Sequence, residues 1–470
     1  MARKKNRAEY HILTVTGWAG EGHGVGRLPD GRVVFVPWAL PGDEVEVACL
    51  RTKKNFLQGR VVRLIQPSPQ RQEAPCRHFG QCGGCTLQHT PYAYQLQLKQ
   101  QHLEGLLRHL GRFPAPPVEA PLACPEPWGY RNKLDFAFSE RRWLPAEQLG
   151  NPDVPAAPGC GFHVAGHFDK VLHIEKCLLQ PENNDQLRKA FHEAAQKRGI
   201  SYYNARTGQG MLRGLILRCN RRGDWMVVLV VNAGGASIAE EMLASVAEDF
   251  PSVVSWFYIV NGKANDSLHD LVPVLWKGQP WLEESLAGLH FRIHPKSFFQ
   301  TNPSQAERLY LLAREMAEAG PETRLLDLYC GTGTTTAILG RYARQALGVD
   351  VVPEAIEDAR YNALRNGLHH VEFICGDSAR ILTGDHVARW GLPDVLVTDP
   401  PRAGMTPTVC QEILRLRPQR MVYISCNPAT LIRDLNHLSE AYEVRRIQPV
   451  DMFPHTRHLE CVALLTLKPH

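Results

Sequence analysis

The chain has 470 residues, 44% of them hydrophobic, so it is long enough for roughly two to four domains with buried cores. It has no run of 18 apolar residues, and its start, MARKKNRAEY, lacks the apolar stretch of a secretory signal, so we expect a cytoplasmic protein without a membrane span. A net charge of +5 favours anionic partners only weakly. The 13 cysteines are scattered and odd in number, which favours metal binding or thiol chemistry over a disulfide framework.

Residues 1–68 are predicted to form a small β-barrel. Short β-rich runs such as HILTVTGW, VVFVPWAL and GRVVRLI alternate with turns, of which Asp30-Gly31 and the PGD at 41–43 suit tight reversals. Five short strands in so few residues are typical of an OB-like fold, which often binds oligonucleotides. The basic residues nearby fit this role, but they equally fit an ordinary solvated terminus and loop.

Residues 69–290, after the proline-containing linker QPSPQRQEAP, are predicted to form a mixed α+β domain. A helix is expected at 92–110, and it could pack on the following domain. The runs LRGLILRC and WMVVLVVN read as strands.

Four cysteines of this middle region form a candidate metal site. Cys76, Cys82 and Cys85 lie in CRHFGQCGGC, and Cys177 follows much later in EKC. Four thiolates suit either zinc or an iron-sulfur cluster, and spacing alone slightly favours zinc, because four-cysteine zinc sites are common.

Residues 291–470 alternate strands with helices, which predicts a doubly wound, Rossmann-like α/β domain around a parallel sheet. Ligands of such domains bind beyond the carboxyl ends of the strands. The first strand leads into DLYCGTGT, a glycine turn that contains Tyr329, Gly331, Gly333 and Thr334. The third glycine of the dinucleotide fingerprint is missing, so a smaller ligand than a dinucleotide fits better.

Acidic residues follow successive strands of this domain. Asp350 comes 23 positions after Asp327, close to the separation at which a carboxylate reaches ribose hydroxyls. Asp377 follows the next strand, where an adenine edge would lie, and Asp399 opens the DPPR after the fourth. Any one of them could be a helix cap, but four around a glycine turn favour a nucleoside cofactor. Ribose without pyrophosphate indicates S-adenosylmethionine.

The fifth strand, VYIS, is followed by Cys426. If the fourth and fifth strands are neighbours, its thiol lies beside Asp399 at the cofactor edge. A thiolate that adds to C6 of a pyrimidine makes C5 nucleophilic towards a methyl group, and elimination then needs a base, for which Glu460 is a candidate. A structural cysteine and a surface glutamate are the alternatives. Three cysteines in apolar runs are expected to be buried and inert: Cys330, Cys375 and Cys461.

Six segments, FFQTN, DLYCGTGT, GVD, DPPRAG, SCNPATLIRD and DMFPHTRHLE, together resemble the RNA (uracil-5-)-methyltransferase family, specifically its 23S ribosomal-RNA branch. The resemblance implies methylation of uridine C5, with Cys426 as nucleophile and Glu460 as base. It also implies a site for S-adenosylmethionine formed by Gln300, Tyr329, Thr334, Asp350, Asp377 and Asp399. Tyr329 and Thr334 stand where the family often has Phe and Asn.

The same resemblance extends to the front of the chain. It implies that residues 1–68 are a TRAM domain, an OB-like RNA-binding barrel, and that the four cysteines hold a 4Fe-4S cluster in preference to zinc. The expected partner is ribosomal RNA, with tRNA as the alternative, and the protein is expected to be a monomer. The target uridine must lie in a loop or be flipped out. Candidates for RNA contact are Arg131, Phe299, Phe453 and Arg457.

Three other functions share some of these features. A cytosine-5 RNA methyltransferase typically has a cysteine after the DPP motif, where this chain has Arg402. An amino-group methyltransferase would want an aromatic residue there and would not need Cys426. A non-catalytic RNA-binding protein would not require the ordered carboxylates.

Overall fold

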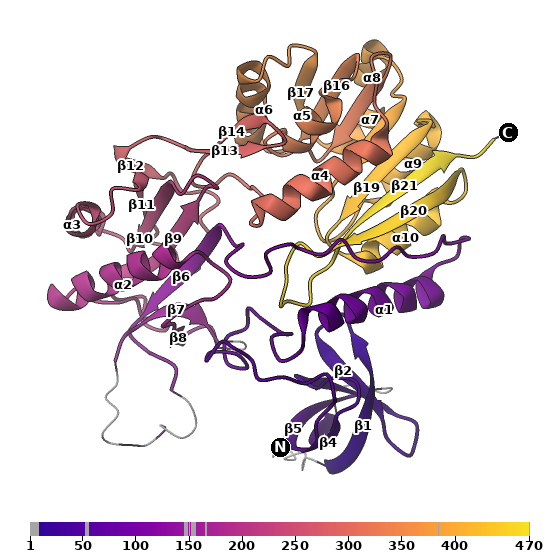
Figure 1. Cartoon of the computed structure of the whole chain (residues 1–470). Coiled ribbons are helices and arrows are strands. Elements are labelled where there is room, and N and C mark those ends of the chain that lie inside the picture. Colours follow the sequence, from indigo (N-terminus) through magenta and orange to yellow (C-terminus); the bar gives the residue numbers. More distant parts are fainter. Residues whose placement is uncertain are drawn as a thin grey trace, which may run out of the picture.

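The computed structural model describes residues 9–51, 56–144, 149, 151, 157–164, 167–383 and 385–469. These residues form an N-terminal barrel, a central sheet covered by two helices, and a doubly wound C-terminal domain (Figure 1). Within this described part of the chain, no helix combines the length and the apolar character needed to cross a membrane.

The N-terminal barrel is closed, with strand order β1-β2-β3-β5-β4. The strands are β1 (Glu9–Ala19), β2 (His23–Arg27), β3 (Val33–Pro37), β4 (Glu44–Arg51) and β5 (Phe56–Gln66). Alternate residues such as Val34, Val36 and Val47 fill its interior, as the two-residue period of a strand requires. Gly31 and Gly42 have φ angles of 86° and 92°, which explains glycine in both predicted turns. The predicted OB-like barrel is confirmed.

The central sheet has seven strands in the order β12-β11-β10-β9-β6-β7-β8. The strands are β6 (Lys133–Ser139), β7 (Gly159–His163), β8 (Val171–His173), β9 (Leu212–Cys219), β10 (Trp225–Val231), β11 (Val253–Val260) and β12 (Val274–Gly278). Helices α2 (Glu182–Lys197) and α3 (Ala236–Ala247) cover one face, where Phe191 and Met242 pack against Leu215 and Val227. This is the mixed α+β module predicted for the middle of the chain.

The C-terminal domain has a seven-stranded sheet in the order β17-β16-β15-β18-β19-β21-β20, in which only β21 runs against its neighbours. Its elements are α4 (Pro303–Ala317), β15 (Arg324–Leu328), α5 (Thr334–Gly340), β16 (Gln345–Asp350), α6 (Pro353–Arg365), β17 (Val371–Cys375), α7 (Ser378–Thr383), α8 (Asp385–Trp390), β18 (Val395–Thr398), α9 (Pro407–Leu416), β19 (Arg420–Ser425), α10 (Pro428–Leu438), β20 (Tyr442–Val450) and β21 (Glu460–Leu467). The order reverses between β15 and β18, the switch point at which doubly wound sheets bind ligands. The predicted fold class is confirmed.

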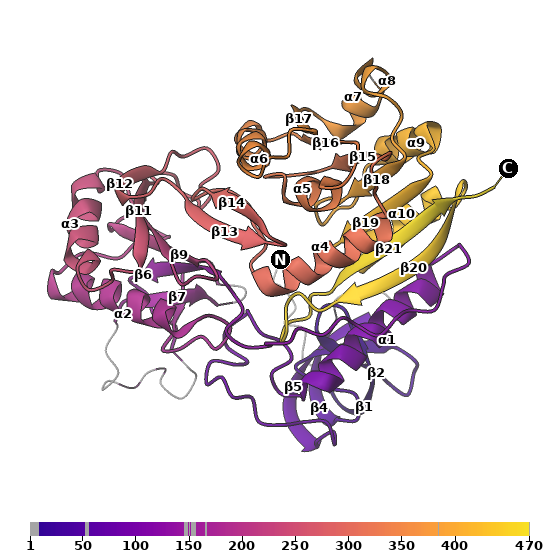
Figure 2. The same ribbon diagram turned by 45° about the horizontal axis from the view of Figure 1, so that its top comes forward.

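Two segments that begin before residue 291 pack on this domain. Helix α1 (Tyr92–Leu110) lies between the barrel and the C-terminal sheet (Figures 1 and 2), and its Leu103 and Leu107 join the C-terminal core. The hairpin of β13 (Leu282–Leu286) and β14 (Leu289–Ile293) packs into the same core. The C-terminal domain therefore depends on residues far earlier in the chain.

Candidate active site

Strand register brings Cys426 and Glu460 together. Cys426 directly follows β19, and the next residue, Asn427, caps α10 by accepting a hydrogen bond from the Ala429 amide at 3.2 Å. Strand β21 begins at Glu460 and pairs antiparallel with β19, with Ser425 opposite Cys461. The start of β21 thus lies at the carboxyl end of β19, so the carboxylate and the thiol are neighbours.

The surroundings of both groups raise their pKa values. Burial, then the negative charges of Glu460 and Asp399, raise the pKa of the half-buried Cys426 thiol to about 11, and the Arg402 charge opposes this. Burial, then Asp399, raise the pKa of Glu460 to about 8, again against Arg402. The Arg402 Nη2 lies 3.3 Å from Nδ1 of His458. Glu460 can therefore accept a proton near neutral pH, and Arg402 favours the thiolate.

Asp399 connects these two groups to the cofactor edge predicted from the sequence. Burial raises its pKa to about 7, and its negative charge in turn raises the pKa of Asp327, at the end of β15, as well as those of Cys426 and Glu460. The ends of β15, β18, β19 and β21 therefore converge around one carboxylate. The thiol lies at the ligand edge of the sheet, as the order of the fourth and fifth strands predicted.

The glycine turn folds over the end of β16. Oδ2 of Asp350 accepts a hydrogen bond from the Gly331 amide at 2.9 Å, and its Oδ1 accepts one from the Val352 amide at 2.9 Å. Gly333 has a φ of 79°, and a Cβ there would lie 2.8 Å from the Phe373 ring, so only glycine fits. Thr334 follows as the first residue of α5 and is buried.

The other predicted cofactor residues lie along the same edge. Tyr329 has a left-handed φ of 67°, and burial followed by the nearby charge of Asp377 raises its pKa to about 12. Asp377 is exposed and accepts a hydrogen bond from the Arg380 amide at 3.1 Å. Gln300 forms a side-chain hydrogen bond with Tyr310. Burial is the main cause that raises the pKa of Tyr310, and the charge of Asp399 raises it as well, which places Asp399 near both side chains.

Polar atoms at this edge remain available to a ligand. Among the described residues, Oδ1 of Asp327 and Oγ1 of Thr398 are buried without a hydrogen-bond partner, although the other Asp327 oxygen accepts from Thr336 at 2.6 Å. Buried polar atoms normally find partners, so a bound polar molecule would complete them. Together with the exposed Asp377 carboxylate and the close-packed glycine turn, they fit a nucleoside cofactor.

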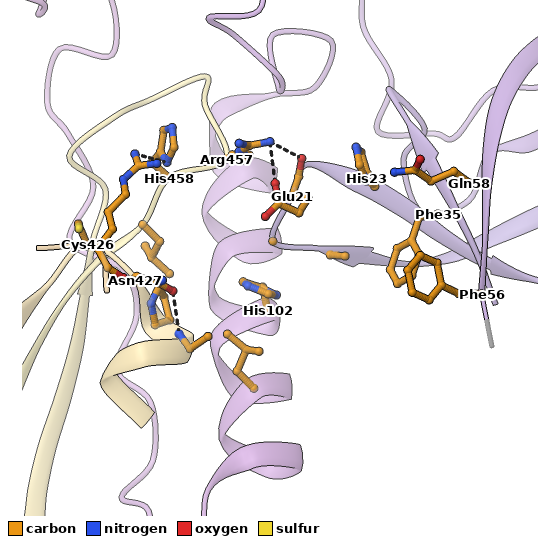
Figure 3. A pocket seen from close by; sticks show the side chains of 17 residues that line it. Glu21, His23, Phe35, Phe56, Gln58, His102, Cys426, Asn427, Arg457 and His458 are labelled. Atoms are coloured by element: carbon orange, nitrogen blue, oxygen red, sulfur yellow. Dashed lines mark hydrogen bonds and ion pairs between the residues drawn. The ribbon is translucent and has the colours of Figure 1, made fainter. Parts of the chain in front are cut away.

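Cys426 also borders a cavity of about 490 Å³ between the C-terminal domain and the barrel (Figure 3). Residues of three regions line it: Arg402, Cys426, Asn427, Arg457 and His458 from the C-terminal domain, His102 and Leu106 from α1, and Glu21, His23, Phe35, Phe56 and Gln58 from the barrel. The Arg457 guanidinium joins the two walls by donating to the Glu21 carbonyl at 3.0 Å. On the barrel side, the Phe35 and Phe56 rings meet edge to face at 5.5 Å.

The sequence did not identify His102, Phe35 or Phe56 as site residues. Their sequence gives no signal beyond an aromatic or histidine side chain, because the cavity forms only where α1 and the barrel meet the C-terminal domain. Of the four residues predicted to contact RNA, only Arg457 lines this cavity, and Phe299 is buried in the C-terminal core.

Three cysteines expected to be buried do not share one environment. Cys330 and Cys461 are buried as predicted, but Cys375 is exposed. The prediction for Cys375 was wrong because β17 is the edge strand of the sheet, so an apolar run there is not covered on every side.

The four middle-region cysteines are close to one another. Burial, followed by the charges of Cys177, Cys82 and Cys76, raises the pKa of Cys85 to about 12, against a hydrogen bond from Gln88 that lowers it. Within the described ranges, however, no group of three or more His, Cys, Asp or Glu side chains is arranged to hold a metal ion. The four side chains are of the type that binds zinc or an iron-sulfur cluster, and they lie near one another. Their positions are nevertheless not those of a closed metal site.

The strand order, the glycine turn and the acidic strand ends define a domain of the doubly wound methyltransferase class. Residues 282–468 match the family tRNA (uracil-5-)-methyltransferase, and residues 4–62 match the TRAM domain. The chain belongs to the uracil-5 RNA methyltransferase family, as the sequence motifs predicted.

Similar proteins span nearly the whole chain. An uncharacterized RNA methyltransferase of Bacteroides thetaiotaomicron is 42% identical over 96% of this chain and 100% of its own, and one of Halalkalibacterium halodurans is 36% identical over 98% of each. The crystal structure of Pyrococcus abyssi tRNA (uracil-54, C5)-methyltransferase with S-adenosyl-L-homocysteine superposes with a TM-score of 0.75. It is 29% identical and covers 97% of this chain and 100% of its own.

Proposed function

We propose that the protein methylates C5 of a uridine in RNA, with S-adenosylmethionine as the methyl donor. The observation that carries this proposal is that Cys426, Glu460 and Asp327 of the cofactor edge all lie near Asp399, whose charge raises the pKa of each. Family membership supports the same activity. The ordered carboxylates speak against a purely RNA-binding role.

The two catalytic side chains divide the chemistry. The Cys426 sulfur bonds to C6 of the uracil, and the electron pair of the C5–C6 double bond moves onto the ring as an enolate whose C5 is nucleophilic. Bound S-adenosylmethionine would supply an electrophilic methyl group. Glu460 then takes the C5 proton, the C5–C6 double bond re-forms, and the C6–S bond breaks to return the thiolate. A base with a pKa of about 8 suits this last step near neutrality.

The cofactor residues would each hold a different part of the donor. The oxygens of Asp350 would bind the ribose hydroxyls, Asp377 the adenine edge, and Gly331 and Gly333 would let the backbone approach. Tyr329 would lie beside Asp377, and Thr334, Gln300 and Asp399 would complete the site. This assignment follows the family pattern onto the matching positions.

The RNA would run through the cavity between the C-terminal domain and the barrel. Cys426 opens onto it, Arg402 and Arg457 supply positive charge, and Phe35 and Phe56 offer rings on which unstacked bases can lie. A duplex would keep its bases out of reach of the thiol, so the target is a single-stranded or flipped uridine.

We propose ribosomal RNA as the substrate, following the resemblance to the 23S branch. Transfer RNA is the second candidate, because the similar Pyrococcus abyssi protein is a tRNA methyltransferase. Mapping 5-methyluridine in RNA from cells with and without the gene distinguishes them: loss of the nucleoside from ribosomal RNA supports the first, and loss from tRNA alone supports the second.

We also propose that Cys76, Cys82, Cys85 and Cys177 hold a 4Fe-4S cluster. The support is the proximity of four thiols, the donor set that such clusters use. Because the methyl transfer needs no redox step, the cluster would hold the surrounding loops together. Iron and sulfide analysis of anaerobically purified protein should give both elements, and Cys85→Ser should lose them; zinc without sulfide would contradict the cluster.

Purified protein incubated with S-adenosylmethionine and RNA tests the activity itself. We expect 5-methyluridine as the product. Formation of 5-methylcytidine or of an amino-methylated base would contradict the proposal, and so would RNA binding without any cofactor binding.

A further inference from the structure

The loop that leads from β20 to Glu460 is held by residues from distant parts of the chain. Strand β20 ends at Val450, which is paired with Glu460 in the sheet, so the intervening residues return the chain to the same place. Residues that hold this loop through hydrogen bonds or ring contacts include Leu87, Gln95, Lys99, Trp128, Tyr130 and Asn302. None of them belongs to the loop's own strands.

At the centre of the loop, His455 has an unusual backbone conformation. Its φ is 65°, a left-handed value that persists in a non-glycine residue only where the surroundings enforce it. Oε1 of Gln95 accepts a hydrogen bond from the His455 amide at 2.9 Å, and the His455 carbonyl accepts from the amides of Thr86 and Leu87. The His455 ring stacks on Trp128 at 3.6 Å.

At the start of the loop, Lys99 of α1 and Asp451 form an ion pair that is wholly buried, with 0% exposure of both side chains and 2.5 Å between Nζ and Oδ1. The same ammonium donates to the Phe453 carbonyl at 3.2 Å, so it ties two points of the loop together. Asp451 is the residue directly after the Val450–Glu460 pair. Buried ion pairs add little net stability, and one role for them is to specify a single conformation.

We propose that Lys99 is a positioning residue for the elimination step, which fixes the Glu460 carboxylate against C5 through Asp451 and the loop. The inference rests on the proposed function, because it concerns the proton that Glu460 removes. Without that proton transfer, the C6–S bond formed by Cys426 has no route to break. A misplaced Glu460 should therefore leave methylated RNA attached to the protein.

Lys99→Met tests this inference with unmodified substrate RNA and S-adenosylmethionine. We expect turnover to fall about 100-fold, the scale on which small displacements of catalytic groups act. We also expect a protein–RNA adduct to accumulate on denaturing gels, while the Kd for S-adenosylmethionine stays unchanged. Gln95→Leu, which removes contacts to His455 but leaves no unpaired charge, should show the same adduct to a lesser degree.

Arg213→Met is the matched control. Arg213 is also a buried cation that caps loop carbonyls, those of Asn261, Lys263 and Asn265 in the central domain. We expect it to lower thermal stability without trapping RNA. Glu460→Gln should trap the adduct and serves as the reference. If it does, and the folded Lys99→Met and Gln95→Leu variants lose turnover without trapping any adduct, the inference is overturned. If Glu460→Gln traps none either, the proposed chemistry fails and the inference with it.

Discussion

The two halves of the candidate active site are built in different ways. The cofactor half is local: the Gly331 amide reaches Asp350 across 19 residues and Thr336 reaches Asp327 across nine. The catalytic half is held from afar, because Lys99 and Asp451 are 352 residues apart. One strand, one turn and one helix form the first half, whereas the loop that leads to Glu460 is held by residues from distant parts of the chain.

Replacing the thiol breaks the catalytic half alone and has the largest expected effect. Cys426→Ala should lower methyl transfer at least about 10⁴-fold, because it removes the sulfur that would bond to C6. Binding of S-adenosylmethionine should persist, which calorimetry can measure. Cys375→Ser, which alters an exposed thiol, should leave turnover unchanged. Full turnover of Cys426→Ala would contradict the covalent chemistry.

Replacing Asp350 breaks the cofactor half alone. Asp350→Ala should weaken S-adenosylmethionine binding about 10- to 100-fold, since it removes charge-assisted hydrogen bonds to the ribose and releases the Gly331 amide. RNA affinity should not change. Equal losses of cofactor and RNA affinity would mean that the two halves are not separate.

The barrel side of the cavity differs from both halves of the site, because its residues should affect RNA binding and not S-adenosylmethionine binding. Phe35→Ala should weaken RNA binding about tenfold, the scale of one lost stacking contact. Tyr10→Ala removes an exposed barrel aromatic that does not line the cavity and should have no effect. Filter binding at fixed salt measures both, and an equal loss in the two variants would place the RNA elsewhere.

The smallest expected effect is a shift in pH dependence. Glu460 must be ionised to take the C5 proton, so elimination should speed up as pH rises through about 8. Arg402 stabilises that carboxylate, so Arg402→Met should move the rising limb to higher pH. The rate at which the preformed adduct decays, measured by rapid quench at a series of pH values, gives this pH dependence. A shift of the rising limb to lower pH in Arg402→Met would contradict the assignment of Glu460 as the base.

Sequence patterns predicted where the residues of the local half lie in the fold. The period of the strands and the glycine turn located Asp350, and the strand break at Asn427-Pro428 located Cys426 at a sheet edge. Each of these features depends on residues that are near one another in the sequence. The barrel and the doubly wound domain were predictable for the same reason.

The distant half was not predictable in this way. Lys99 interrupts the buried face of α1 between Leu98 and Leu103, which signals a buried charge but does not identify its partner. His102, Phe35 and Phe56 reach the cavity only through the packing of α1 and the barrel against the C-terminal domain. Contacts across hundreds of residues depend on tertiary packing, and no periodicity encodes them.

Trapping with RNA that carries 5-fluorouridine at the target position tests the central claim most directly, because fluorine at C5 cannot leave as a proton. With S-adenosylmethionine present, peptide mapping should find the nucleotide bonded to the peptide that contains Cys426. Methylation of ordinary RNA by a protein that forms no such bond, or forms it at another cysteine, would contradict the account.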